Sequence, residues 1–567
     1  MKKKNKIHFI FIALSILFLT TSIYLNINTT SSAKERIITE INNKPIVVEP
    51  AIEEIEEPET GEVVEEEEIT NSYTNTELSI IIITSIVSVI CLLNIITTKF
   101  GTKSLIESLS TSKALIYYTI FLVLLTTTVT LSNVILTDKR ILNGPETKER
   151  HEKSLAIIEI KETMKGNSIT ETSKEQDTSI IQVSNQATYT GEDLNLTKES
   201  GETTDKESSI YYGLNSAVIV KDGSSMELID SDITTNVSYS SAFFLTGLNG
   251  TAKLDNINIS TNKEYSSGLV SSDYGSITAL DLDITTKGDN STSLKSITSN
   301  SEINIEDSYL YTEGLYSPLI YSSGKINLTN TDGTALNSNI ATIEGSNSIT
   351  ITDSKLTTEH ITDNDNPAGI YIYNEQSKSI SADYTNATFT STSSRLTIKE
   401  TDNYENIPMF YVTNIKATIN ITDTELDYSN NILLKVVGND TYGDIGNNGG
   451  EVTFTATDQE LKGNIEIDDI SKVRFNLNNS HYEGQINGND SSKAVDITFD
   501  KTSTWTLTGD SYINTLTIQN GKISRLSRSI KSNGYDIYYN ANLNEWLNGK
   551  TIRLSGGGKL IPVFYES

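Results

Sequence analysis

The chain has 567 residues, enough for several ordinary domains, and its formal net charge is −30, from 74 acidic and 44 basic residues. This charge argues against a nucleic acid partner, because phosphate binding requires a basic surface. Only 36% of the residues are hydrophobic, and many of these lie in three N-terminal stretches. The remainder is too polar for one thick core and favours a thin solenoid or partial disorder.

The three apolar stretches are each long enough to cross a bilayer. They cover Ile7–Ile23, Leu78–Ile96 and Ala114–Leu136, with no charge inside, and about 20 apolar residues span the hydrocarbon core. The first, within residues 1–25, is either an uncleaved signal anchor or a signal peptide. The other two predict a helical hairpin over residues 78–136. We therefore expect the lipid bilayer to be a partner of three N-terminal helices.

The charges of the intervening loops predict the orientation. Four lysines precede the first stretch, and the loop 97–113 carries three lysines against one glutamate, so both are expected in the cytoplasm. Residues 26–77 contain two runs of glutamate and several prolines, which indicates an acidic, disordered extracellular loop. The predicted localisation is the cell membrane, multi-pass, with the C-terminal domain extracellular.

Residues 137–176 are expected to be a stalk and linker. Pro145 suits the first turn of a helix running to Met164, with Gly166 just beyond it. The mixed charges of this stretch indicate a solvated helix, and the residues up to Gln176 have a linker composition.

A repeat of about 25 residues begins near Asp177 and extends to residue 567. A small residue followed by an apolar one recurs at spacings of 25, 26, 25 and 25 residues, and an Asp or Asn motif recurs in step with it. Two-residue alternation within each unit indicates short strands, and strands stacked in register form a β-solenoid. A β-sandwich, the competing fold, does not explain why the same residue types recur at regular intervals. One inward ladder is predicted: Val218, Phe243, Leu269, Leu294 and Leu319.

The recurring acidic or amide position is interpreted as a turn rather than a cation site. Asn replaces Asp freely along this row, which a turn accepts and a charge-driven site does not. The row is Asp230, Asn256, Asp307, Asn330, Asp353 and Asp423.

Several segments of residues 177–567 together resemble adhesin-like β-helix repeat proteins of low-GC Gram-positive bacteria and methanogens. They include Tyr212–Val218, Met409–Asn414, Thr504–Asp510 and Trp546–Lys550. The resemblance implies an all-β fold, a right-handed parallel β-helix of the pectate-lyase-like architecture, displayed outside the cell after the N-terminal transmembrane helices. It implies an adhesin-like role and no particular ligand.

An enzyme on this scaffold is the alternative. Asn330-Thr331-Asp332-Gly333 copies the first carboxylate motif of polygalacturonase-like hydrolases. The expected downstream Asp-Asp, Gly-His-Gly and Arg-Ile-Lys motifs do not follow within about a hundred residues, although such chemistry needs a further acid and base. We therefore expect no catalytic residues and interpret the match as a turn.

The candidate binding residues fall in two polar insertions and a tyrosine cluster. Oxygen-rich loops can hold Ca²⁺, so Asp363 and Asp365 are weak metal candidates; no other cofactor is expected. Loops on a rigid scaffold often bind ligands, and exposed tyrosines can stack on sugars. The weak ligand candidates are Asp440, Asp444, Asn447, Tyr309, Tyr311 and Tyr316.

These features predict a non-enzymatic, membrane-anchored surface protein that presents a polar face for adhesion or for binding an envelope glycan or protein. The alternative is a membrane-tethered polysaccharide lyase or glycoside hydrolase.

Overall fold

The computed structural model describes residues 154–359, 366–375, 386–399, 407–429, 431–492, 494–519 and 521–565. The three predicted spans, the acidic loop, Asp363 and Asp365 lie outside these residues. In the described ranges, no helix has the length and apolar character needed to cross a bilayer.

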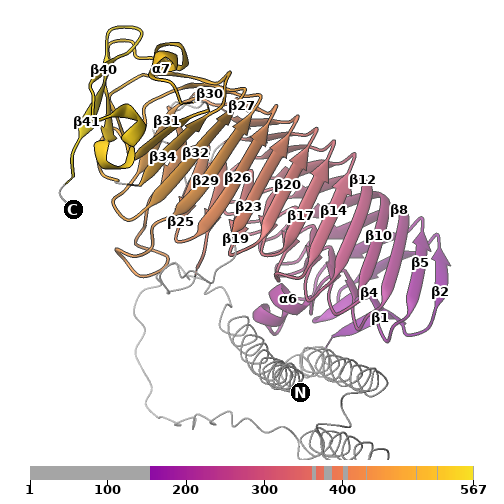
Figure 1. The fold of residues 1–567 in the computed structure, drawn as a ribbon. Coiled ribbons are helices and arrows are strands. Elements are labelled where there is room, and N and C mark those ends of the chain that lie inside the picture. Colours follow the sequence, from indigo (N-terminus) through magenta and orange to yellow (C-terminus); the bar gives the residue numbers. More distant parts are fainter. Residues whose placement is uncertain are drawn as a thin grey trace, which may run out of the picture. The chain divides into compact units, whose positions relative to one another are not determined.

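Most strands belong to two long sheets whose neighbours are parallel (Figure 1). Sheet A has twelve strands, in spatial order β1 (Leu155–Ile160), β4 (Thr178–Val183), β7 (Val218–Val220), β9 (Phe243–Leu245), β11 (Leu269–Ser271), β13 (Leu294–Ser296), β16 (Ile320–Ser322), β19 (Ala341–Glu344), β22 (Ile370–Tyr373), β25 (Phe410–Thr413), β28 (Ile432–Val436) and β31 (Asn464–Ile467).

Sheet B runs beside it and contains β2 (Met164–Asn167), β3 (Thr170–Ser173), β5 (Thr188–Glu192), β6 (Asn195–Lys198), β8 (Ser225–Thr235), β10 (Thr251–Thr261), β12 (Ser276–Thr286), β14 (Glu302–Glu306), β15 (Tyr309–Thr312), β17 (Lys325–Thr329), β18 (Asp332–Ala335), β20 (Ser348–Thr352), β21 (Lys355–Thr358), β23 (Ala387–Thr392), β24 (Arg395–Ile398), β26 (Lys416–Thr422), β27 (Glu425–Asp427), β29 (Glu451–Thr457), β32 (Lys472–Asn478), β34 (Val495–Phe499) and β37 (Thr515–Ile518).

Two smaller sheets complete the C-terminal coils. Sheet C contains β30 (Glu460–Lys462), β33 (His481–Glu483), β35 (Thr504–Thr506) and β38 (Ile530–Lys531). Sheet D contains β36 (Ser511–Ile513), β39 (Ile537–Asn540), β41 (Lys559–Val563) and β40 (Ile552–Arg553). The described helices are α6 (Lys206–Tyr212), α7 (Ile523–Ser529) and the 3-10 turns η1 (Ala541–Leu543) and η2 (Glu545–Leu547).

The pairing of strands one coil apart fits a parallel β-helix. In β8, β10 and β12 the residues facing the interior are buried and the intervening ones point out. The interior is filled by one continuous apolar cluster that runs from Ile160 to Leu560. Each coil therefore buries its apolar residues mainly against its two neighbours, as the repeat predicted.

The predicted inward ladder is confirmed for four members and wrong for the fifth. Val218, Phe243, Leu269 and Leu294 are register partners and fully buried. The next partner is Ile320, not Leu319. The cause is the length of one turn. The turn between β13 and β14, residues 297–301, is one residue longer than the turn between β11 and β12, residues 272–275. Leu319 is buried one position before β16.

The solenoid also begins earlier than expected. Strands β1, β2 and β3 occupy the segment predicted to be a helical stalk and linker, and β1 pairs with β4 in parallel. The helix prediction to Met164 is therefore wrong over Leu155–Ile160. This strand reads Leu-Ala-Ile-Ile-Glu-Ile, and β-branched residues with a neighbouring coil to pair with favour a strand over a helix.

The Asp and Asn row adopts the left-handed backbone conformation predicted for a turn. The φ values of Asp230, Asn256, Asp307, Asn330, Asp353 and Asp423 lie between 45° and 54°. Each residue bends the chain at a corner of sheet B and interrupts the in–out alternation. Among residues with a Cβ, Asn and Asp tolerate this conformation best.

We expect Asp353→Ala to lower the free energy of unfolding by about 1 kcal/mol, because the left-handed backbone conformation is sterically unfavourable for alanine. Asp353→Asn is the matched control and should be nearly neutral. Urea unfolding followed by circular dichroism measures both. An equal loss of stability in the two variants would show that Asp353 stabilises the fold through its carboxylate and not through its backbone conformation.

Candidate functional site

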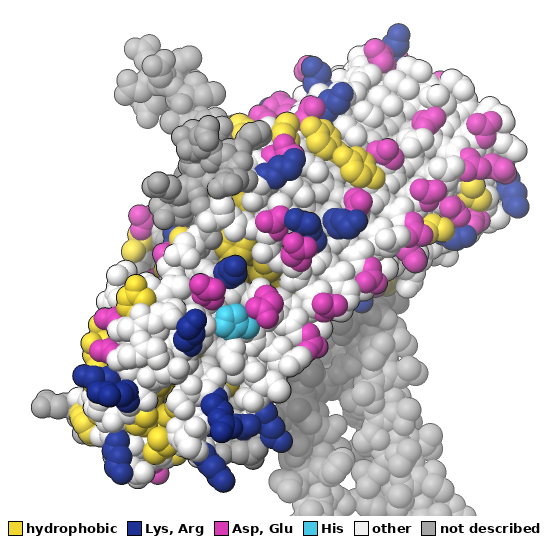
Figure 2. All heavy atoms as spheres, turned by 90° about the horizontal axis from the view of Figure 1, so that it is seen from above, with side chains coloured by type: hydrophobic (Ala, Val, Ile, Leu, Met, Phe, Trp, Pro, Cys, Tyr) yellow, Lys and Arg dark blue, Asp and Glu magenta, His cyan; other side chains and the backbone are white. Residues whose placement is uncertain are grey.

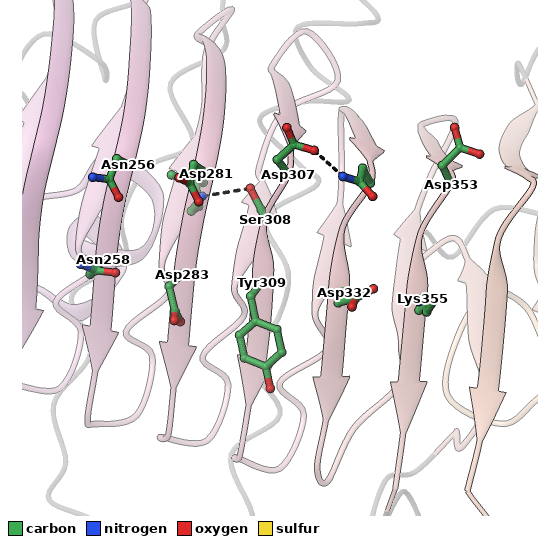
Figure 3. A pocket seen from close by; sticks show the side chains of 12 residues that line it. Asn256, Asn258, Asp281, Asp283, Asp307, Ser308, Tyr309, Asp332, Asp353 and Lys355 are labelled. Carbon is green, nitrogen blue, oxygen red and sulfur yellow. Dashed lines mark hydrogen bonds between the residues drawn. The ribbon is translucent and has the colours of Figure 1, made fainter.

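A shallow polar groove of about 740 Å³ runs across the outer face of sheet B, over β10 to β21. Two outward rows of side chains line it, one at the left-handed corner and one two residues further along each strand (Figure 3). The lining side chains are mostly oxygen-bearing: Asn256, Asn258, Asp281, Asp283, Asp307, Ser308, Tyr309, Asn330, Asp332, Asp353 and Lys355, with Leu282.

Amides bridge neighbouring coils within these rows. Asn256 Nδ2 donates to Asp230 Oδ1 over 2.6 Å, and Asn258 Nδ2 donates to Asp232 Oδ1 over 2.8 Å. Asn330 donates in the same way to Asp307 (Figure 3). The remaining lone pairs of these carboxylates and amides can accept hydrogen bonds from a ligand, and the remaining amide N–H groups can donate them.

Small hydroxyl residues make the floor of the groove rigid. Ser308 is buried; its Oγ accepts the backbone N–H of Leu282 over 3.2 Å and donates to the carbonyl of Glu306 over 2.8 Å. Two coils further along the solenoid, Ser354 Oγ accepts the backbone N–H of Thr331 over 3.0 Å. The backbone beneath the two outward rows of side chains is therefore held in place by hydrogen bonds, which preorganises these side chains for a ligand.

Tyr309 is the aromatic member of the groove. It lies between Asp283 and Asp332 in the register of sheet B and is 44% exposed. Tyr311 points to the same face two residues further along β15 and is half-buried. Tyr316 lies beyond the end of β15, at another corner, with a φ of 54°. The structure thus brings Tyr309 and Tyr311 together and separates Tyr316 from them.

The second group of predicted binding residues lies elsewhere. Asp440, Asp444 and Asn447 are exposed in the 437–450 loop between β28 and β29. Buried Asn448 anchors this loop by donating from Nδ2 to the carbonyl of Tyr442 over 2.6 Å. Tyr442 packs on Tyr373 of sheet A with ring centroids 4.6 Å apart, so this loop adjoins the other sheet.

The outer face of sheet A carries a polar cluster that sequence reasoning missed. The Tyr321 hydroxyl donates to Glu344 and lies 3.0 Å from the Tyr373 hydroxyl, while Ser323 Oγ donates to Glu344 over 3.0 Å. Lys295 Nζ stands 5.5 Å from the centre of the Tyr321 ring. Burial, and then the nearby Glu344, raise the pKa of both tyrosines well above the usual value, and burial lowers the pKa of Lys295.

Three tyrosines of this face pack against one another. Tyr371 stacks on Tyr373 at 4.9 Å and contacts Tyr411 at 5.3 Å, and all three are almost fully buried. A signal for this cluster is present in the sequence, at the position directly after each residue of the inward ladder. This position is apolar in three successive coils, as Ile219, Phe244 and Val270. It becomes polar in the next two coils, as Lys295 and Tyr321.

No metal site emerges among the residues that the structure describes, since no group of three or more His, Cys, Asp or Glu side chains there is arranged to hold an ion. Asp363 and Asp365, the weak Ca²⁺ candidates, lie outside those residues and stay a prediction.

Comparison with protein-family models, with curated proteins and with solved structures finds no match. The class of protein is therefore defined by its architecture alone, a parallel solenoid with a polar groove on one sheet. The chemistry of that groove, rather than the fold, indicates the function.

Proposed function

We propose that the chain is a membrane-anchored cell-surface protein whose extracellular solenoid binds a glycan in the polar groove of sheet B. The supporting observation is the pair of amide and carboxylate rows beside exposed Tyr309. Planar amides and carboxylates hydrogen-bond sugar hydroxyls, and a tyrosine ring covers the apolar face of a sugar. Five aspartates against Lys355 in the lining favour a neutral glycan over an acidic one.

In this proposal the solenoid is a right-handed β-helix of adhesin-like type, because crossovers between parallel strands are right-handed in nearly all proteins. Three N-terminal helices in the bilayer hold it at the cell surface, and the repeated coils carry the groove on a rigid support. Binding by this groove needs no cofactor.

The test is a glycan-array screen of the purified full-length chain, followed by affinity measurements on neutral hits. Tyr309→Ala should weaken binding at least tenfold, since it removes the stacking surface without touching the core. Tyr316→Asn is the matched control, because Asn accepts the left-handed backbone and Tyr316 lies at another corner. The control should stay within twofold. No neutral hit, or an equal loss in both variants, would contradict the proposal.

One observation favours a second candidate, a polysaccharide-cleaving enzyme. The groove gathers Asp281, Asp283, Asp307 and Asp332 near Lys355, and Asp332 belongs to the hydrolase-like motif noted in the sequence. Two carboxyl groups are the minimum for glycoside hydrolysis. Release of reducing or unsaturated ends from a bound glycan, abolished by Asp332→Asn, would establish the enzyme and overturn the purely adhesive function.

A further inference from the structure

The C-terminal end of the solenoid reverses the charge of the chain. Residues 521–565 contain seven cations and only two acidic residues, Asp536 and Glu545, in a protein whose formal net charge is −30. We call the seven cations the terminal basic patch; they are Lys522, Arg525, Arg528, Lys531, Lys550, Arg553 and Lys559. Figure 2 shows Lys and Arg side chains gathered toward the end of the solenoid where the C-terminus lies in Figure 1.

Some cations elsewhere on the solenoid are paired with carboxylates of a neighbouring coil. Lys253 lies 3.1 Å from Glu227, Lys325 lies 2.8 Å from Glu302, and Arg474 lies 3.4 Å from Glu451. Within the described residues, none of the seven cations of the terminal basic patch forms such an ion pair. All except half-buried Arg525 are exposed. The patch therefore presents uncompensated positive charge to solvent.

Two of these cations are held directly opposite each other. Arg553 on β40 and Lys559 on β41 are partners in the antiparallel pair of sheet D. Directly opposed residues project to the same face, and like charges in such a pair destabilise it. Since Leu560 is fully buried, Lys559 and Arg553 point outward. The chain thus keeps an unfavourable pair where a single carboxylate would have stabilised the hairpin.

A stacked pair of tyrosines occupies the same outer face. Tyr512 stacks on Tyr538 with ring centroids 4.7 Å apart and an angle of 10° between the rings. Tyr538 is the register partner of Ile561, which lies two residues after Lys559 on β41. Sheet D therefore displays two cations and two half-exposed aromatic rings side by side.

Two carboxylates near sheet D, those of Asp510 and Asp536, accept hydrogen bonds from the backbone. Asp510 Oδ1 accepts the N–H of Asp536 over 2.8 Å, and Asp536 Oδ1 accepts the N–H of Lys559 over 2.7 Å. These carboxylates link successive coils at the start of β36, β39 and β41, and neither forms an ion pair with a cation of the terminal basic patch.

We propose that the terminal basic patch is a second binding site, specific for an acidic polysaccharide that bears carboxylate or sulfate groups. The acidic groups of the polysaccharide form ion pairs with Arg553 and Lys559, and a sugar ring packs on the stacked rings of Tyr512 and Tyr538. The acidic remainder of the solenoid repels such a polymer, so it is bound only at this end. The site is independent of the groove on sheet B, which suits neutral glycans.

The test measures binding of the full-length chain, purified in detergent, to polygalacturonate and heparin. Dextran of similar length serves as the neutral probe and single-stranded DNA of equal charge as the non-sugar polyanion. We expect both acidic polysaccharides to bind more tightly than either comparison polymer, and their affinity to fall at least tenfold between 50 and 500 mM NaCl.

Lys559→Glu separates binding from folding. It places a carboxylate opposite Arg553, which stabilises the β40–β41 pair, so the thermal midpoint should not fall, whereas affinity for polygalacturonate should fall at least tenfold. Lys165→Glu applies the same charge change on the body of the solenoid, at an exposed position of β2 opposite Thr190, and should leave affinity within twofold. The proposal is overturned if neither polysaccharide binds, if the DNA binds as tightly as they do, or if the two variants lose affinity equally.

Discussion

Replacing Phe243 by aspartate is expected to unfold the coils around it while the distant coils stay folded. Phe243 is fully buried and stacks between Val218 and Leu269 in the inward ladder. The substitution removes a large apolar side chain and buries a carboxylate without a partner, at a cost of about 5 kcal/mol or more. That is comparable to the whole stability of many domains. Because each coil is stabilised chiefly by its neighbours, the damage should remain regional.

Hydrogen exchange followed by mass spectrometry measures this effect strand by strand. Peptides covering β7, β9 and β11 should lose protection, and peptides covering β32 and β34 should keep it. Thr278→Asp is the matched control, since Thr278 is an exposed, outward residue of β12, and it should leave all peptides protected. Uniform loss of protection along the whole chain would show that the solenoid unfolds as a single unit.

Replacing Trp505 by alanine is expected to lower the stability of the C-terminal coils by about 3–5 kcal/mol. Trp505 is fully buried and contacts Tyr482 and Phe499, with ring centroids 6.1 and 6.5 Å apart. Its Nε1 donates to the carbonyl of Gly484 over 2.9 Å. The variant leaves a cavity too large for these neighbours to fill and removes the donor from a buried carbonyl.

Urea unfolding measured through the remaining tryptophan, Trp546, reports on this end of the solenoid, because the chain has two tryptophans in all. The midpoint should fall for Trp505→Ala and stay nearly unchanged for Thr506→Ala, whose side chain points outward on the same strand. Equal shifts would indicate that strand pairing, rather than the aromatic core, stabilises these coils.

The local features of this protein were predictable because each depends on a few adjacent residues. Two-residue alternation predicts which side chains of β8 and β10 face the interior, and the Asp or Asn at each corner predicts the left-handed turn, as at Asp230. The period of about 25 residues predicts that strands pair one coil apart. The membrane spans and the function depend on residues and ligands outside the described structure, and they stay predictions.

Lateral relations between coils could be recognised only in the tertiary structure. The length of one turn decides that Ile320, and not Leu319, pairs with Leu294. Strand pairing brings Asp283, Tyr309 and Asp332 into one groove and separates them from Tyr316 and from the 437–450 loop. It likewise joins Lys295, Tyr321 and Glu344, which lie in three successive coils, and sets Arg553 opposite Lys559. Alternation along a strand is encoded by its own residues, whereas neighbours across coils depend on the summed lengths of the turns between them.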